Sequence, residues 1–158
     1  MNFITQKNQD GAALITALLM VLVISILGVA VSQQVVSLRK TSTSNYDHTL
    51  SLNHAESALS EADRVIRVNY LAPDALKALS VEMNESPNWW REESNWVGAT
   101  VVNDVPDGAP AYLIENDGIN DLMIGSKGIK RRFYRVTAKA QGKGEAMAFI
   151  QTYYATLE

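Results

Sequence analysis

Residues 11–38 contain no Asp, Glu, Lys or Arg, and this uncharged stretch constrains the chain more than any other feature of its sequence. Within it, residues 12–31 read AALITALLMVLVISILGVAV, an apolar run interrupted only by Thr16, Ser25 and Gly28. A helix of about twenty residues is roughly 30 Å long, which matches the hydrocarbon core of a bilayer. The segment is therefore expected to form a helix that is long enough to cross a membrane.

Three readings of this apolar run differ in where the chain is cut. A secretory signal peptide has a shorter apolar region followed by a small-x-small site, for which Ala30-Val31-Ser32 is the candidate. An uncleaved membrane anchor fits the length but gives Gly11 no role. In the third reading the chain is cut after Gly11, so that the polar leader is lost and the apolar helix is kept. The length of the run argues against the signal peptide.

The residues after the apolar run predict that the same helix continues. Apolar or small residues recur at spacings of three and four, at Val35, Val36, Leu38, Tyr46, Leu50, Ala55, Ala58, Leu59, Ala62, Val65 and Ile66. No proline occurs between residues 1 and 72. We expect one helix from about Ala12 to about Asn69, apolar on all sides at first and amphipathic later. Pro73 is expected near the start of a short second helix within 73–83.

From residue 97 onward the apolar period changes from that of a helix to that of strands. Short strands are expected in 97–102 and 112–114, and 132–140 alternates cleanly. In the last of these, one face is expected to pack and the other, with Arg135, Thr137 and Lys139, to meet water. Gly142 and Gly144 are expected to supply positive φ in a turn that leads to a final strand within 145–157. The expected fold class is α+β, one long N-terminal helix on a small antiparallel sheet.

Composition and motifs give little sign of catalysis. The 158 residues carry 14 basic and 17 acidic side chains, a formal charge of −3, too mild to indicate a nucleic-acid-binding protein. The chain has no cysteine, which excludes disulfides, Cys-ligated metals and a thiol nucleophile. With only His48 and His54, we expect no histidine metal site and no catalytic triad. The chain is predicted to be a non-enzyme without a cofactor.

Four further features have two readings each. His54 is expected at the edge of the packed helix face in a structural role, although histidine is also a metal ligand. Residues 114–122, IENDGINDL, lack the spacing of a calcium loop, so a turn is favoured. The basic run 127–132 is read as a solvated strand entry rather than a phosphate-binding patch. Burial between helix and sheet is favoured for three tryptophans that are also candidate partner contacts, Trp89, Trp90 and Trp96.

Two segments resemble one protein family, in the right order. The first, a glycine followed by AALITALLMVLVISILGVA, is similar to the N-terminal segment of PilX-type minor pilins of type IV pili. The second, YRVTAKAQGKGEAMAFIQTYYA at residues 134–155, resembles the final hairpin of that family. The resemblance implies a pilin-like fold and three parts, namely a prepilin leader (1–11), a membrane and filament-core half-helix (12–38) and a periplasmic head domain (39–158).

The resemblance also implies processing and partners. A prepilin peptidase is expected to cut between Gly11 and Ala12 and to methylate the new amino group of Ala12. The protein is then expected in the inner membrane with its bulk in the periplasm, and later in the pilus. Implied partners are other minor pilins, the major pilin, a tip-associated adhesin and the inner-membrane assembly platform. The implied roles are priming of pilus assembly, with adhesion, twitching motility and DNA uptake downstream.

One position departs from the family pattern. Most pilins carry glutamate at the fifth residue of the mature chain, and here that residue is Thr16. A threonine can bond to its own helix backbone, which avoids burial of a carboxylate in lipid. In pilins that glutamate is thought to pair with the amino terminus of the neighbouring subunit in the filament, and so to serve as a docking charge. The absence of this charge suggests a place at or near the pilus tip, but Thr16 is also readable as a tolerated replacement. Two rival functions stay open, a minor pseudopilin of type II secretion and a single-span periplasmic binding module that never polymerises.

Overall fold

A computed structural model describes residues 10–103, 105, 108–120 and 131–157, so the leader before Asp10 lies outside the described part. Helix α1 runs from Asp10 to Val68, which confirms the expected long helix to within two residues at each end. The chain divides between Thr43 and Ser44 into two compact units. We call residues 12–38 of α1 the apolar half, residues 44–68 the packed half, and the unit from Ser44 onward the head.

In its described residues the head contains, after the packed half of α1, a short helix, two 3₁₀ turns and five strands. In chain order these are α2 (Pro73–Ala78), β1 (Val81–Glu82), η1 (Trp89–Arg91), η2 (Glu93–Trp96), β2 (Thr100–Val101), β3 (Ala111–Asn120), β4 (Arg131–Gln141) and β5 (Met147–Leu157). Helix α2 begins at Pro73, as expected, because a residue without an N–H group suits the first helical turn. It ends before Val81, so the predicted second helix is shorter than the segment 73–83 that was expected to hold it.

The five strands form one sheet in the order β1-β3-β4-β5, and β2 also pairs with β3. The long strands β3, β4 and β5 are antiparallel neighbours, as the sequence predicted. Strand β1 pairs in parallel with β3, with Val81 opposite Glu115, which makes the sheet mixed rather than purely antiparallel. Local patterning could not show this pairing, because β1 has only two residues.

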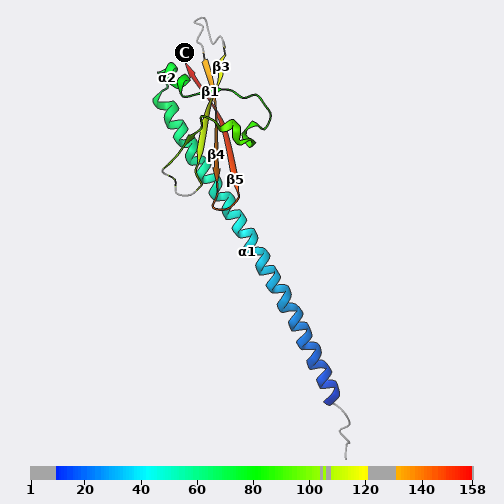
Figure 1. Cartoon of the computed structure of the whole chain (residues 1–158). Helices are drawn as coiled ribbons and strands as arrows, with labels where there is room; N and C mark the ends of the chain where they lie inside the picture. The colour runs from blue at the N-terminus through cyan, green and yellow to red at the C-terminus, as the bar shows by residue number, and fades with distance from the viewer. Residues whose placement is uncertain (1–9, 104, 106–107, 121–130, 158) are drawn as a thin grey trace, which may run out of the picture. The chain divides into compact units, whose positions relative to one another are not determined.

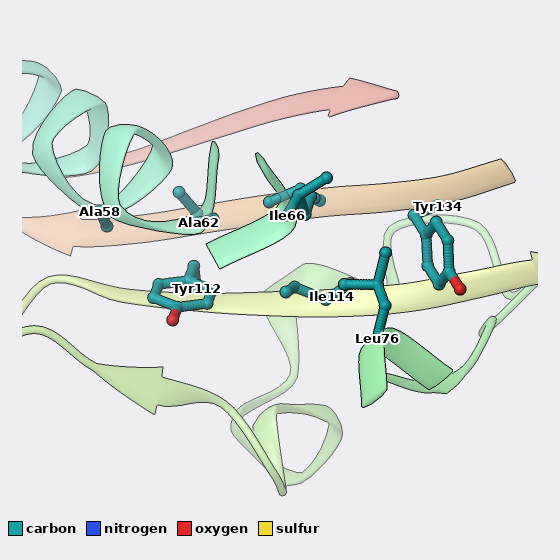
Figure 2. Packing of buried hydrophobic residues seen from close by; sticks show 9 residues of the cluster. Ala58, Ala62, Ile66, Leu76, Tyr112, Ile114 and Tyr134 are labelled. Atoms are coloured by element: carbon teal, nitrogen blue, oxygen red, sulfur yellow. The ribbon is translucent and has the colours of Figure 1, made fainter. Parts of the chain in front are cut away.

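The packed half of α1 covers one face of the sheet (Figure 1). Ala58 and Ala62 have no exposed surface, and they point with Ile66 toward Tyr112 and Ile114 (Figure 2). Alanines let the helix approach the sheet closely, and the tyrosines and aliphatic residues of the sheet fill the remaining space. Leu76 of α2 and Tyr134, Val136 and Ala138 of β4 complete the cluster. This is the core predicted for the inward face of β4.

The other face of the sheet is also covered, as the alternation in the last strand indicated, but the expectation that this face of 132–140 meets water was wrong. Arg135 and Thr137 were expected to meet water, yet Arg135 is 6% and Thr137 2% exposed. Trp89 and Trp96 are buried in a second cluster with Leu113, whose neighbours along β3 face the helix. Trp89 and Trp96 are therefore buried, but they do not lie between helix and sheet as favoured. The segment that carries them forms a third layer.

Two strand boundaries also differ from the predictions. Only Thr100 and Val101 of the predicted strand 97–102 form a strand. Strand β3 extends through Asn120, so most of 114–122 is strand rather than turn, and Asp121 and Leu122 lie outside the described residues. Gly118 has φ +85° at an irregularity in the register with β4 between Asn116 and Ile119. The turn residues mark a bulge inside a long strand.

The described part of the chain thus has a long N-terminal helix, apolar in its first half, whose second half packs on a small sheet. This is the α+β layout of a type IV pilin-like fold.

Candidate assembly site

The apolar half of α1 exposes large hydrophobic side chains on every side. Leu14, Leu18, Leu22 and Ile26 are each more than half exposed, and so are their neighbours around the helix. The helix is long and apolar enough to cross a membrane, and none of its most apolar stretch is buried inside the chain. A surface of this size needs lipid or other protein to cover it.

Hydroxyl groups within the apolar run bond to the helix itself. Thr16 Oγ1 donates to the carbonyl oxygens of Ala13 at 2.9 Å and Ala12 at 3.1 Å. Ser25 Oγ donates to Val21 O at 2.7 Å in the same way. These two hydroxyls are therefore satisfied without water, which lowers their cost in a medium that offers no hydrogen bonds. The predicted backbone bonding of Thr16 is confirmed.

The predicted processing site lies in the first turn of α1. Gly11 is exposed, and a Cβ atom built on it meets nothing within 4 Å. The backbone on both sides of the Gly11–Ala12 bond is helical. The cut itself stays a prediction.

One carboxylate ties the start of the packed half to the turn between β4 and β5. Asp47 Oδ1 accepts a hydrogen bond from Gly144 N at 2.7 Å, and Oδ2 accepts one from Ala146 N at 2.9 Å. These two backbone N–H groups, first Gly144 and then Ala146, hold the pKa of Asp47 below its ordinary value of 3.8. Sequence reasoning missed this contact because ninety-seven residues separate its partners.

The same contact explains the two glycines of that turn. A Cβ atom on Gly142 would lie closer than 3.0 Å to Asp47, and one on Gly144 would lie 2.7 Å from Asp47 Oδ2. Neither glycine has positive φ, so the predicted reason for them was wrong. They are needed because α1 approaches the turn closely.

His54 has the structural role that was expected. It is 8% exposed, and its Nδ1 atom lies 3.2 Å from the carbonyl oxygen of Gln141 at the end of β4. Gly108 lies against the same imidazole ring with φ +87°. The described residues hold no cluster of metal-ligating side chains. The basic run 127–132 is described only from Arg131, and Arg132 is 8% exposed, so this part is not the solvated strand entry expected.

An ion pair and the tryptophan cluster hold the third layer on the sheet. Arg135 of β4 donates to the Glu115 carboxylate of β3 at 2.6 and 2.7 Å. It also donates to the carbonyl oxygen of Asn84 at 2.6 Å, and its guanidinium lies 5.1 Å from the ring centre of Trp89. The hydrogen bonds to Glu115 hold the pKa of Arg135 above its ordinary value.

Of the three tryptophans, only Trp90 keeps a partly exposed surface. Trp96 donates its indole N–H to Trp90 O at 2.9 Å, and Lys139 Nζ lies 4.4 Å from the ring centre of Trp96. Lys139 in turn binds the Glu93 carboxylate at 2.7 Å. The tryptophans therefore make contacts within the chain, and a role in binding a partner stays a prediction.

An open hollow of about 360 Å³ lies at the end of the packed half. It is bordered by Asp63, Ile66, Arg67, Tyr70, Tyr154 and Ala155. Its two charged groups bind each other, with Arg67 Nε 2.6 Å from Asp63 Oδ2. Burial raises the pKa of Tyr154, so its phenol stays protonated at neutral pH.

Residues 10–60 match the protein-family model described as PilX N-terminal. The match covers most of α1 and about a third of the chain. No protein of curated function and no solved structure matches the chain. The match agrees with the resemblance found in the sequence and supports a type IV pilus-related minor pilin in general. The matching family is one of pilin structural components rather than of enzymes.

Proposed function

We propose that this chain is a minor pilin that takes part in priming a type IV pilus, at or near the tip. A prepilin peptidase cuts it between Gly11 and Ala12, and the mature chain waits in the inner membrane with its head in the periplasm. During assembly the apolar half leaves lipid and packs among the helices of neighbouring subunits. Adhesion, twitching motility and DNA uptake depend on the pilus that results.

The observation that carries this proposal is the exposed, uncharged surface of the apolar half. A subunit that moves from lipid to a helical filament core needs a segment that is stable in both. Its large side chains from Leu14 to Val31 are apolar and exposed, and the hydroxyls of Thr16 and Ser25 bond to their own backbone. The transfer therefore exchanges one apolar neighbour for another without the burial of a charge.

Thr16 supports a place near the tip. A glutamate at this position is thought to serve in pilins as a docking charge toward the amino terminus of a neighbouring subunit. Thr16 carries no charge and donates to Ala12 and Ala13 of its own helix. A subunit placed first has no earlier subunit to recognise by such a charge. Its partners are then the other minor pilins, the major pilin and a tip-associated adhesin.

The proposal is tested by deletion of the gene and by immunoblotting of sheared pili. We expect the wild-type chain in the pili, and few or no pili in the deletion strain. Normal pili without the chain would contradict the proposal. Loss of exoprotein export with intact twitching would instead identify a pseudopilin of type II secretion.

Substitution at Thr16 tests the tip placement separately. We expect Thr16→Glu to lower pilus number, because it introduces the docking charge that this subunit lacks and so favours a place inside the filament over the place at the tip. Thr16→Val, which has neither hydroxyl nor charge, is the matched control. Unchanged incorporation and pilus number in Thr16→Glu would show that this position does not specify the place of the subunit.

A further inference from the structure

Strand β5 forms one edge of the sheet. In the part of the chain that the structure describes, Met147–Leu157 pairs with β4 and with no other strand. The pairing is antiparallel and in register along the whole strand, from Gln141 opposite Met147 to Arg131 opposite Leu157. The other edge of β5 therefore presents a long row of backbone donors and acceptors.

The alternation of an antiparallel ladder shows which residues present these groups. Gly142 N donates to Ala146 O at 2.8 Å, so Ala146 turns its carbonyl group toward the inside of the hairpin. Inward-bonding pairs then recur at every second residue, and the residues between them turn their N–H and C=O groups outward. The side chains of these outward residues are exposed as well. The outward residues are Met147, Phe149, Gln151, Tyr153 and Ala155.

This edge has none of the usual protection against strand pairing. Natural edge strands are commonly short, or carry lysine, proline or a bulge. Strand β5 has eleven residues, contains no charged residue and no proline, and pairs without a register shift. The opposite edge of the sheet differs, because there β3 is covered by the two-residue strands β1 and β2. Among the residues that the structure describes, only the β5 edge offers a long template.

We propose that β5 accepts an extended strand from another protein of the pilus assembly, which adds to the sheet beside it. This inference rests on the proposed function and names the contact through which the head binds a partner. The incoming strand is uncharged and has apolar side chains at alternate positions. These side chains lie beside Met147, Phe149 and Tyr153, which are 47%, 36% and 57% exposed. Backbone bonds supply affinity, and these side chains supply specificity.

A second copy of this chain fits the edge less well. In the described residues, the other edge of the sheet carries the two-residue strands β1 and β2. That edge of a second copy is too short to pair with β5 along its length. Pairing β5 with β5 requires a two-fold axis that reverses the strand direction. Such a pair closes after two chains, whereas under the proposed function a minor subunit at or near the tip has other pilus proteins as its neighbours. A different protein is therefore the occupant.

Photo-crosslinking in piliated cells tests the pairing. A benzoyl-phenylalanine residue is placed in the full-length chain at Gln151, Tyr153 or Ala155, one at a time, and the linked peptide is mapped by mass spectrometry. We expect all three to link one segment of another protein, with the linked position moving by two residues at each step. The same probe at Glu56, an exposed residue of α1, is the control and should not link that segment. Links to β5 of a second copy, or links without this two-residue step, would overturn the proposal.

A proline substitution tests the backbone bonds themselves. Gln151→Pro removes one outward N–H group and leaves the ladder to β4 in place, since its own N–H faces away from β4. We expect about a tenfold fall in the amount of chain in sheared pili, because the partner's carbonyl loses its donor and meets the ring. Gln151→Thr keeps the N–H group and should assemble like the wild type. Both variants lose the side-chain bond from Gln151 to Thr137.

The outcomes separate this inference from the proposed function. Thermal unfolding of each variant in detergent first establishes that the head is folded. If the wild-type chain is absent from pili, the proposed function fails. If the wild type is present and folded Gln151→Pro is incorporated equally well, only the strand pairing fails.

Discussion

The two halves of α1 have the same secondary structure but rely on different surroundings. In the packed half, Ala55, Ala58 and Ala62 have no exposed surface, because the sheet lies against them. In the apolar half, Leu22 and Leu27 remain 56% and 58% exposed, although they are much more hydrophobic. Exposure here is therefore opposite to what hydrophobicity alone predicts for a soluble protein. The apolar half is built to be covered by something other than its own chain.

This difference predicts that the head determines the stability of the fold, whereas the apolar half determines where in the cell the protein resides. Substitutions in the head should change its free energy of unfolding, because its core is complete within the chain. Substitutions in the apolar half should change where the protein resides and leave the unfolding of the head unaltered. The following predictions test that separation.

The largest effect on the head is expected at the buried ion pair. Glu115→Leu leaves the Arg135 guanidinium buried without its carboxylate, which should cost about 3–5 kcal/mol in the free energy of unfolding. Urea unfolding followed by tryptophan fluorescence measures this loss. The double variant Glu115→Leu/Arg135→Leu should recover much of it, because no unpaired charge remains. A double variant as unstable as the single one would show that packing, not charge, dominates.

A charge placed in the apolar half should affect membrane insertion and leave the stability of the head unchanged. Leu22→Asp places a carboxylate near the middle of the apolar run and should cost about 3 kcal/mol in membrane insertion. We expect the chain to leave the carbonate-resistant membrane fraction, while the thermal unfolding temperature of its head stays at the wild-type value. Leu22→Ala is the control for lost volume. A Leu22→Asp chain that stays in the membrane would refute the anchor.

A pair of identical substitutions compares the halves directly. Ala58→Leu adds bulk between helix and sheet and should destabilise the head by about 1–3 kcal/mol. Ala30→Leu makes the same change in the apolar half, where the side chain is exposed, and should leave the head unaltered. Urea unfolding of both variants in detergent provides the comparison. Equal effects would show that the two halves are not independent.

Asp47 should give a smaller, pH-dependent effect. Its pKa in the folded head lies below 3.8, so its bonds to the β4–β5 turn stabilise the head fully above that value. This contribution is lost as pH falls through the depressed folded-state pKa. Asp47→Asn should therefore unfold at a lower temperature than the wild type at pH 5 to 7, with the gap closing below pH 3.8. A gap that persists at the lowest pH would contradict the role of the charge.

Local patterns predicted the parts of the fold that are set by nearby residues. The spacing of apolar residues located α1, and Pro73 marked the start of α2. The alternation along β4 identified Tyr134 and Val136 as core residues. These features depend on helix and strand periods, which a single sequence displays.

The missed features all depend on contacts between distant residues. Arg135 was expected in water because it alternates with core residues, but Glu115 and the layer that carries Trp89 cover it. Gly142 is required by Asp47 of α1 rather than by a positive φ. The processing site and the role of position five stay predictions, which were made because Gly11, Ala12 and Thr16 lie in the segment that resembles a known family. No local signal marks the free edge of β5, which is a property of the assembled sheet.

Mass spectrometry of the amino terminus of the protein purified from its host's membranes tests the central claim most directly. The claim is that the apolar half of α1 is kept as an anchor after the leader is removed. It predicts a chain that begins at N-methylated Ala12. An intact Met1, or a chain that begins at Gln33, would contradict it.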